Sequence, residues 1–434
     1  MKKIIFTFVL LQFILNSNAQ SLYFPPLTGK TWDTMHPQSL NWCTARIDSL
    51  YNYLQVKNTK SFIILKNGKI VLEKYFGTYT ADSLFYWASA SKSLAGFITG
   101  IAQQKGYIQI NNKVSQYIGQ GWTSAPLVKE NLITVKHLLK MTAGLDDLPP
   151  SPCDHIDTAK ACLIYKADAG TRWGYHTGAY RKVQDVVSAT VGINYNSITN
   201  NWIESKTGMS GFWLDQIYYS KARDMARFGL LNLNKGIWGA DTLLKDSLFF
   251  KDMINTSQTL NEAYGYLWWL NGKPTFMTPQ VQFTFSGTLM PNAPSDMYCA
   301  LGKNDQKIYV VPSQKLVVIR QGNSAGGFNL AASAFDNVLW DYINKLNCTS
   351  ASLAEENFNN KLMLYPNPSN GKLYVSNEHV STIKTIVAIN LLGEQTYLKF
   401  NSNEIDVSAL SKGIYSFAIT FTNGQQSFKK MILN

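Results

Sequence analysis

The fold of this chain is decided by the stretch Trp87-Ala-Ser89-Ala-Ser91-Lys92-Ser-Leu-Ala-Gly-Phe97-Ile98. It opens an apolar segment whose large residues recur at helical spacing, up to a helix stop at Gly106. Residues three apart lie on one face of a helix, so the Lys92 amine can reach the Ser89 hydroxyl. This is the minimum geometry for a serine that a lysine activates as a nucleophile.

The Ser-x-x-Lys spacing alone is weak, because it recurs at Ser369/Lys372, Ser381/Lys384 and Ser427/Lys430. Those three copies sit among turn residues or in short alternating segments. The copy at Ser89 follows a strand-like run, Leu84-Phe-Tyr-Trp87, and precedes a helix. This context favours Ser89 as the functional serine.

The composition is that of a globular protein large enough for more than one domain. Of the 434 residues, 45% are hydrophobic and 16% are charged. The formal net charge is +12, but the positive residues are scattered, without a basic run or an Arg/aromatic stripe. We therefore expect a solvated basic surface and no nucleic-acid partner.

The N-terminus has the pattern of a secretory signal peptide, residues 1–19. Lys2 and Lys3 precede an apolar core, and small residues lead to a cleavage site after Ala19. The apolar run is too short to span a membrane comfortably, and no later stretch approaches a transmembrane length. We expect a protein without a membrane span, periplasmic in transit and then secreted or at the cell surface.

Five cysteines would then face an oxidising compartment. Cys153 and Cys162 flank a short loop and are the best disulfide candidate. Whether Cys43 pairs with Cys348 is left open, and Cys299 would be the odd cysteine, buried in a strand. No Cys/His spacing suggests zinc, so neither a metal nor a cofactor is expected.

Alternating apolar runs predict an antiparallel sheet with helices on it. Two β-rich runs flank Asn67-Gly68, a strong hairpin signal, and a helix is predicted over 40–54. Strands at 298–302, 308–312 and 316–320 precede a helix at about 331–343. The polar turn at 303–306 would present groups from the edge of this sheet to a cleft.

Two further segments bear on the site. Thr134 is predicted to cap a short helix, which makes His137 a structural residue more readily than a catalytic base. Glycines on both sides of Tyr175 let the backbone turn tightly and direct a phenol towards a cleft.

The chain is predicted to hold two folded parts. A main domain at 20–347 is followed by a polar linker at 348–360. Residues 361–434 contain only short alternating strands and turn signals, which predicts a small all-β sandwich.

A rival nucleophile stands at Ser324, in a Gly-x-Ser-x-Gly match between a strand and a helix. The α/β-hydrolase fold needs its histidine after this serine, and His379 in the terminal module is the only one there. The sheet before Ser324 is also predicted to be antiparallel. We interpret Gly322 to Gly327 as a strand-to-helix loop.

Four segments together resemble the class C β-lactamase and penicillin-binding-protein-like serine hydrolases. They occur in the order of that family and cover most of residues 40–345, which implies a β-lactamase/transpeptidase-like α+β fold with a helical subdomain. The segments are Phe85-Tyr-Trp-Ala-Ser-Ala-Ser-Lys92, Leu138-Leu-Lys-Met-Thr-Ala-Gly-Leu145, Ala169-Gly-Thr-Arg-Trp-Gly-Tyr-His-Thr177 and Gly302-Lys-Asn-Asp-Gln306 through Pro312.

The resemblance implies an acyl-enzyme mechanism. Ser89 would be the nucleophile, Lys92 would help to deprotonate it, and Tyr175 would relay protons. The backbone N–H groups of Ser89 and Gln306 would form the oxyanion hole.

Two departures from the family pattern bear on the substrate. Thr177 stands where the family has Asn, and Lys303-Asn304-Asp305 stands where β-lactamases have Lys-Thr-Gly. Lys303 keeps the cation, but a carboxylate at Asp305 should disfavour anionic β-lactams. We expect a hydrolase of small ester, amide or peptide-like substrates, of the esterase, D-aminopeptidase/DD-peptidase or β-lactamase type. A catalytically silent binding protein on the same fold is the alternative.

The terminal module resembles the C-terminal sorting domain of type IX secretion substrates. Leu364-Tyr-Pro-Asn-Pro-Ser-Asn-Gly371, Leu410-Ser-Lys-Gly-Ile-Tyr415 and a basic end carry this resemblance. It implies an export machinery as partner. A substrate-binding β-sandwich is the alternative, although the module lacks an aromatic platform.

Overall fold

The computed structural model describes residues 22–326, 334–348, 362–376, 383–390, 393–422 and 426–434. Contacts divide the chain into two compact units, Met1–Leu346 and Asn347–Asn434. The expected signal peptide lies outside the described residues, as does the expected linker from residue 349 on. The boundaries predicted for these segments therefore stay predictions.

The first unit is built on a six-stranded sheet in which every pairing is antiparallel. The hairpin predicted around Asn67-Gly68 is confirmed, and both turn residues have positive φ, 53° and 82°. The first strand also pairs with the last, Thr59 opposite Gly322. In spatial order the strands are β2 (Lys69–Tyr75), β1 (Thr59–Lys66), β13 (Leu316–Gly322), β12 (Gln306–Val311), β11 (Tyr298–Gly302) and β8 (Trp269–Leu270).

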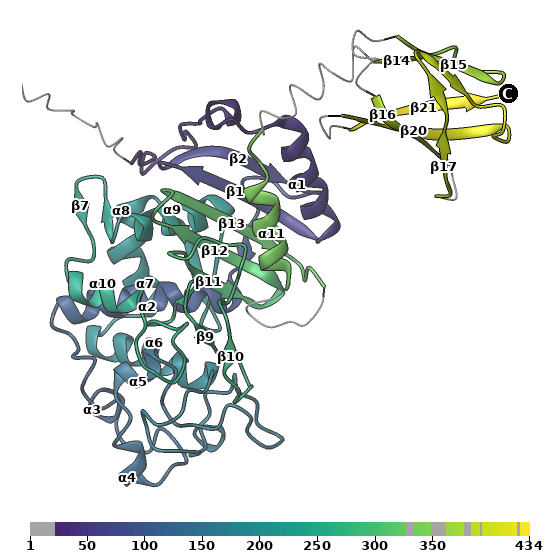
Figure 1. Ribbon diagram of the computed structural model, residues 1–434. Helices are drawn as coiled ribbons and strands as arrows, with labels where there is room; N and C mark the ends of the chain where they lie inside the picture. Colours follow the sequence, from purple (N-terminus) through teal and green to yellow (C-terminus); the bar gives the residue numbers. More distant parts are fainter. Residues whose placement is uncertain (1–21, 327–333, 349–361, 377–382, 391–392, 423–425) are drawn as a thin grey trace, which may run out of the picture. The chain divides into compact units, whose positions relative to one another are not determined.

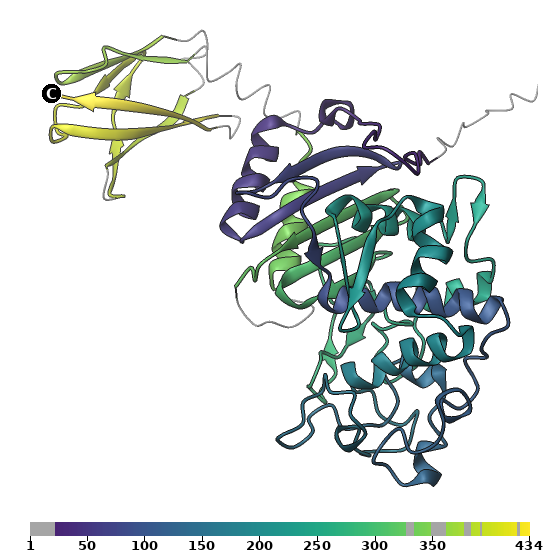
Figure 2. The same ribbon diagram turned by 180° about the vertical axis from the view of Figure 1, so that it is seen from behind.

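Helices cover the sheet on both faces (Figures 1 and 2). On one face α1 (Thr44–Val56) packs beside α11 (Ala334–Asn344), and α9 (Ala222–Leu233) packs on β12 and β13 from the other. A Cβ atom at Gly229 would lie 2.5 Å from Val317, so glycine allows α9 to approach the sheet closely. The helix predicted over 40–54 begins later, at Thr44, after a 3-10 turn at Pro37–Leu40.

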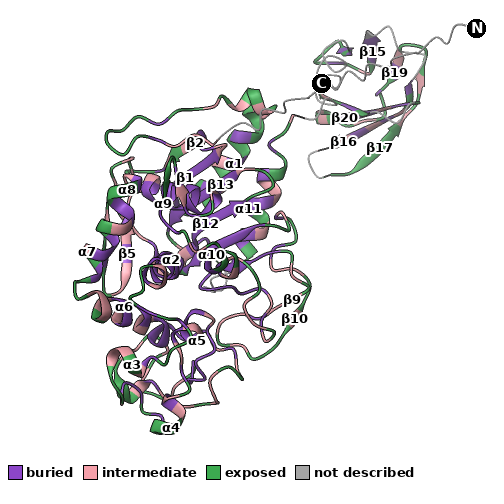
Figure 3. Cartoon of the chain, turned by 90° about the vertical axis from the view of Figure 1, so that its left-hand side faces the viewer, coloured by how far each residue is buried: buried purple, intermediate pink, exposed green. Residues whose placement is uncertain are grey.

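Helix α2 (Ser91–Gln104) joins the sheet to a helical subdomain (Figure 1). Its residues from Ser91 to Ala102 are all buried (Figure 3). The other helices of this unit are α3 (Ser115–Ile118), α4 (Leu127–Glu130), α5 (Val135–Leu139), α6 (Thr177–Val191), α7 (Tyr195–Thr199), α8 (Ser205–Thr207) and α10 (Ser247–Met253), with a π-helical turn at Asn200–Glu204.

Small sheets complete the first unit. The one that bears on the site has three antiparallel strands, β3 (Phe85–Tyr86), β5 (Ile217–Ser220) and β4 (Gly211–Leu214). The other two are hairpins, β6 (Ile237–Trp238) with β7 (Asp241–Thr242) and β9 (Thr275–Phe276) with β10 (Phe285–Ser286).

The second unit is the predicted all-β sandwich. Its two four-stranded sheets enclose a core that includes Leu373, Ile386 and Phe417. One sheet holds β14 (Met363–Tyr365), β15 (Lys372–Ser376), β19 (Glu404–Asp406) and β18 (Phe400–Asn401). The other holds β17 (Gln395–Leu398), β16 (Ile383–Asn390), β20 (Gly413–Phe421) and β21 (Gln426–Leu433).

The antiparallel sheet does not support Ser324 as an α/β-hydrolase nucleophile, because that elbow follows a strand of a largely parallel sheet. Ser324 lies in an irregular segment after β13, where its Oγ atom accepts a hydrogen bond from the Gly326 N–H group at 3.2 Å. His379 lies outside the described residues. In the described part of the chain, no helix is long and apolar enough to cross a membrane.

Candidate active site

Ser89 lies in a short 3-10 turn, Ala88–Ala90, directly before α2, and Lys92 is the second residue of that helix. The Lys92 Nζ atom donates a hydrogen bond to the Ser89 Oγ atom over 2.9 Å. Ala88 has a φ of 49°, a left-handed conformation that costs energy for a residue with a Cβ atom. The turn therefore needs support from its surroundings.

Strand β5 supplies that support. The Trp87 indole, fully buried, donates to the Ser220 hydroxyl at 2.9 Å, and the Tyr218 N–H group donates to the Ser91 hydroxyl at 2.9 Å. The Trp87 N–H group also bonds to the Tyr218 carbonyl at 2.8 Å. Ser89 is thus fixed by residues on both sides of it.

Lys92 is suited to act as a base. Its side chain is buried, and this burial, reinforced by the charge of Arg181, holds the pKa of Lys92 well below its ordinary value. The rings of Tyr175 and Tyr180 lie 5.0 and 4.7 Å from the amine. The ring faces favour a charged amine and so oppose the lowering of the Lys92 pKa, but the loss of hydration has the larger effect on this pKa. A neutral amine can accept the Ser89 proton.

Tyr175 lies beside Ser89 in the loop before α6. Its ring stacks on Trp269, with centroids 5.8 Å apart and planes at 24°, and meets the edge of Tyr264. Burial raises the pKa of Tyr175, while hydrogen bonding to Ser89 lowers it by less. The phenol therefore stays protonated at neutral pH and can donate a proton.

These groups open into a cavity of about 440 Å³. Ser89, Lys92 and Tyr175 line it together with Thr177 and Lys303. The fold thus brings Tyr175 into one cavity with Ser89 and Lys92, which lie far from it in the sequence.

Gln306 and Asp305 do not belong to the described residues that line this cavity. The buried Gln306 side chain donates to the Gly322 carbonyl at 2.6 Å and accepts from the Gly322 N–H group at 3.1 Å. The Asp305 carboxylate accepts from the Ala325 N–H group at 2.9 Å and lies 3.3 Å from Lys307. The expectation that Asp305 repels anionic substrates is corrected, because its charge faces the interior.

The turn that carries Lys303 is held by Arg320, which sequence reasoning missed. Asn304 and Asp305 both have a φ of 60°, and Arg320 donates to their carbonyl groups at 3.0 and 2.9 Å. Next to the turn, a Cβ atom at Gly302 would lie 2.4 Å from the Trp87 carbonyl. Glycine there lets β11 run close to the Ser89 turn.

A cluster of buried charged residues lies next to this turn. Lys307 bonds to Asp336 of α11 at 2.9 Å, and the Tyr309 hydroxyl donates to Asp336 at 2.5 Å. Both ions of this pair have fully buried side chains, so each depends on the other for compensation.

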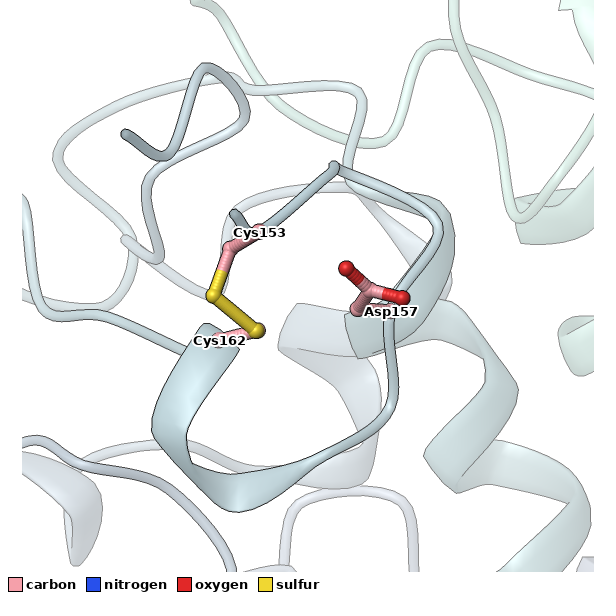
Figure 4. Close-up of side chains that lie close together, drawn as sticks. All are labelled: Cys153, Asp157 and Cys162. Atoms are coloured by element: carbon pink, nitrogen blue, oxygen red, sulfur yellow. A yellow bond between two sulfur atoms is a disulfide. The ribbon is translucent and has the colours of Figure 1, made fainter. Parts of the chain in front are cut away.

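One wall of the cavity contains Asp154, His155 and Ile156. These residues lie in the loop closed by Cys153 and Cys162 (Figure 4). The predicted disulfide is present, and Asp157 lies beside it, with its carboxylate accepting from the Asp154 N–H group at 2.7 Å. Both sulfur atoms are committed to the disulfide, which leaves this cluster unsuited to hold a metal. Cys43 and Cys348 are also disulfide-bonded, and buried Cys299 is a free thiol.

His137 has the structural role expected of it. Thr134 and His137 form a reciprocal capping box at the start of α5. Burial lowers the pKa of His137 to about 4, so the ring is neutral at physiological pH. His137 does not belong to the described residues of the cavity wall.

Comparisons with known proteins show which families and structures this chain is similar to. Residues 58–216 match the family model described as beta-lactamase, and residues 363–434 match the secretion system C-terminal sorting domain. An uncharacterized protein of Alkalihalophilus pseudofirmus is 23% identical over 316 residues, which are 63% of this chain and 87% of that protein.

Solved structures show the same fold. A Bacteroides dorei protein provisionally named a beta-lactamase has a TM-score of 0.55 at 16% identity, covering 70% of this chain and 99% of that one. A Bacillus anthracis protein provisionally named 6-aminohexanoate-dimer hydrolase has a TM-score of 0.54 at 18% identity, covering 73% and 87%.

The first unit has the beta-lactamase/transpeptidase-like fold of these structures, and residues 58–216 within it are similar to the beta-lactamase family. The chain thus combines a segment similar to the beta-lactamase family model with a type IX C-terminal sorting domain. The sorting domain indicates a secreted or cell-surface protein.

Proposed function

We propose that this protein is an exported serine hydrolase that acts through an acyl-enzyme on small ester, amide or peptide-like substrates. The observation that carries the proposal is the 2.9 Å hydrogen bond between Lys92 and Ser89 inside a cavity that also holds Tyr175. A silent binding protein would not need a buried lysine beside a serine hydroxyl.

In the acylation step, the Ser89 hydroxyl proton passes to neutral Lys92 as Oγ attacks the substrate carbonyl carbon. The negative charge on the carbonyl oxygen is stabilised by the Ser89 N–H group. The bond to the leaving group then breaks, and that group takes a proton through Tyr175. In deacylation the proton transfers run in reverse: water attacks the acyl carbon, the bond to the Ser89 Oγ atom breaks and Oγ regains its proton. The acid is released and Ser89 is restored.

The second oxyanion donor that we propose is the Gln306 N–H group. Gln306 pairs with Gly302 across β11 and β12. A Cβ atom at Gly302 would lie 3.1 Å from both the Ala90 N atom and the Gln306 Cβ atom, so the start of β12 lies close to the Ser89 turn.

Labelling by a fluorophosphonate and hydrolysis of a short p-nitrophenyl ester test the proposal. Ser89→Ala should abolish labelling and lower kcat/KM by about 10⁴- to 10⁶-fold, whereas Ser324→Ala should retain both. Labelling that disappears only in Ser324→Ala would move the nucleophile. Absence of labelling and turnover in the wild type would support the silent scaffold.

A further inference from the structure

One cation of the cavity belongs to no expected motif. Arg181, on the first turns of α6, lines the cavity six residues after Tyr175. Its NH1 group donates to the Ile156 carbonyl at 3.0 Å, and its NH2 group donates to the Asp215 carbonyl at 3.1 Å. The guanidinium is thus fixed between the disulfide-closed loop and the turn from β4 to β5.

These partners orient the guanidinium without neutralising it, because a carbonyl carries no net charge. The two hydrogen bonds use two of the five N–H donors of an arginine. Among the described residues, no acid forms an ion pair with Arg181: Asp154 pairs with His155, Asp185 pairs with Lys182 at 3.1 Å, and Asp215 contacts Arg181 through its carbonyl group. Arg181 therefore retains both charge and donors for a ligand.

The rest of the wall does not cancel this charge. The charged side chains among the described lining residues are Lys92, Asp154, Arg181 and Lys303, together with titratable His155. Lys92 is neutral in its reactive form and Asp305 faces away. Among the described lining residues, Asp154 is therefore the single acid beside two cations, Arg181 and Lys303. The cavity is therefore net positive, contrary to the substrate preference expected from the sequence.

We infer that Arg181 determines specificity for substrates whose acyl group ends in a carboxylate, an inference that rests on the proposed acyl-enzyme function. A rigidly held guanidinium can bind both oxygens of a carboxylate with charge-assisted hydrogen bonds. Adjacent lining residues Ile156 and Ile217 would pack on the aliphatic part of such a chain.

The test compares two esters that differ only in charge, mono-p-nitrophenyl adipate and methyl p-nitrophenyl adipate, with the purified full-length chain. The wild type should prefer the adipate monoester, mainly through a lower KM. Arg181→Gln should reduce the ratio of the two kcat/KM values by about 10- to 100-fold, and Arg181→Lys should restore part of it. The ratio cancels general damage to the fold, which would slow both esters alike.

Lys206→Gln is the matched control, because it removes an exposed positive charge on α8, outside the residues that line the cavity, and should leave the ratio unchanged. A wild-type enzyme that hydrolyses both esters equally, or an unchanged ratio in Arg181→Gln, would overturn the inference while leaving the proposed function intact. Should Ser89 prove unreactive, calorimetry with adipate decides: binding that is lost in Arg181→Gln supports the inference, and no binding to the wild type overturns it.

Discussion

The Nζ atom of Lys92 lies 2.9 Å from the Oγ atom of Ser89, at a depth where water cannot hydrate a charged amine well. Burial, with the charge of Arg181 added to it, is what holds the pKa of Lys92 low. The reactivity of the serine is therefore tied to the protonation state of this lysine.

The pH profile of a neutral ester tests this link. Neutral Lys92 is the base, so kcat/KM should rise with pH as Lys92 loses its proton, with a midpoint well below the ordinary lysine value. Arg181→Gln removes a positive charge that lowers the pKa of Lys92, so the acid limb should move to higher pH. A limb that stays in place would show that Arg181 does not influence Lys92.

Tyr175→Phe should separate proton transfer from packing. The ring that stacks on Trp269 remains, so the free energy of unfolding should change by less than about 1 kcal/mol, while kcat/KM falls by about 10²- to 10⁴-fold. Tyr180→Phe is the comparison, because Tyr180 is equally buried and bonds to Gln184 at 3.1 Å. Equal losses of kcat/KM in both variants would show that Tyr175 has no specific role in proton transfer.

Asp336→Ala should be strongly destabilising, by about 3–5 kcal/mol, because it leaves Lys307 buried without its closest counter-charge. Asp341→Ala on the same helix is the control. Its ion pair with Lys345 is half exposed and should contribute less than about 1 kcal/mol. Urea unfolding of both variants measures the difference, and similar midpoints would refute the importance of the buried pair.

The variant Cys153→Ser/Cys162→Ser opens the disulfide-closed loop. We expect a loss of about 2–3 kcal/mol in the free energy of unfolding, the amount that loop-closure entropy predicts for a short loop. Because Asp154, His155 and Ile156 line the cavity, KM should rise more than kcat falls. An unchanged KM would mean that the wall keeps its shape without the bond.

Local patterns predicted the framework of the fold well. The Asn67-Gly68 hairpin and the Thr134 cap depend on nearby residues, and the structure confirms both. Ser89 and Lys92 are three residues apart, so their contact also follows from local geometry. The role of Tyr175 was predicted from its position in the order of the family's motifs, so that prediction rests on the resemblance and not on local geometry.

The misjudged and missed residues depend on contacts that a local sequence pattern does not reveal. Asp305 was expected to face the substrate, but it faces Lys307 and the Ala325 N–H group, and a turn sequence does not disclose which way a carboxylate points. Arg320 looked like one more strand residue, although it holds the Lys303 turn. Arg181 follows the motif by six residues, and its position depends on two loops that the motif does not contain.

The long-range contacts of Arg320 determine when, during synthesis of the chain, the site can form. It bonds to the Lys57 carbonyl at 2.6 Å, 263 positions away in the sequence, as well as to the turn beside Lys303. Closing so large a loop slows folding far more than it weakens the final state. A growing chain that has passed Ser89 and Lys92 but not yet reached β13 therefore holds the nucleophile without a finished site, so hydrolytic competence must arrive late, after nearly the whole first unit has been synthesised.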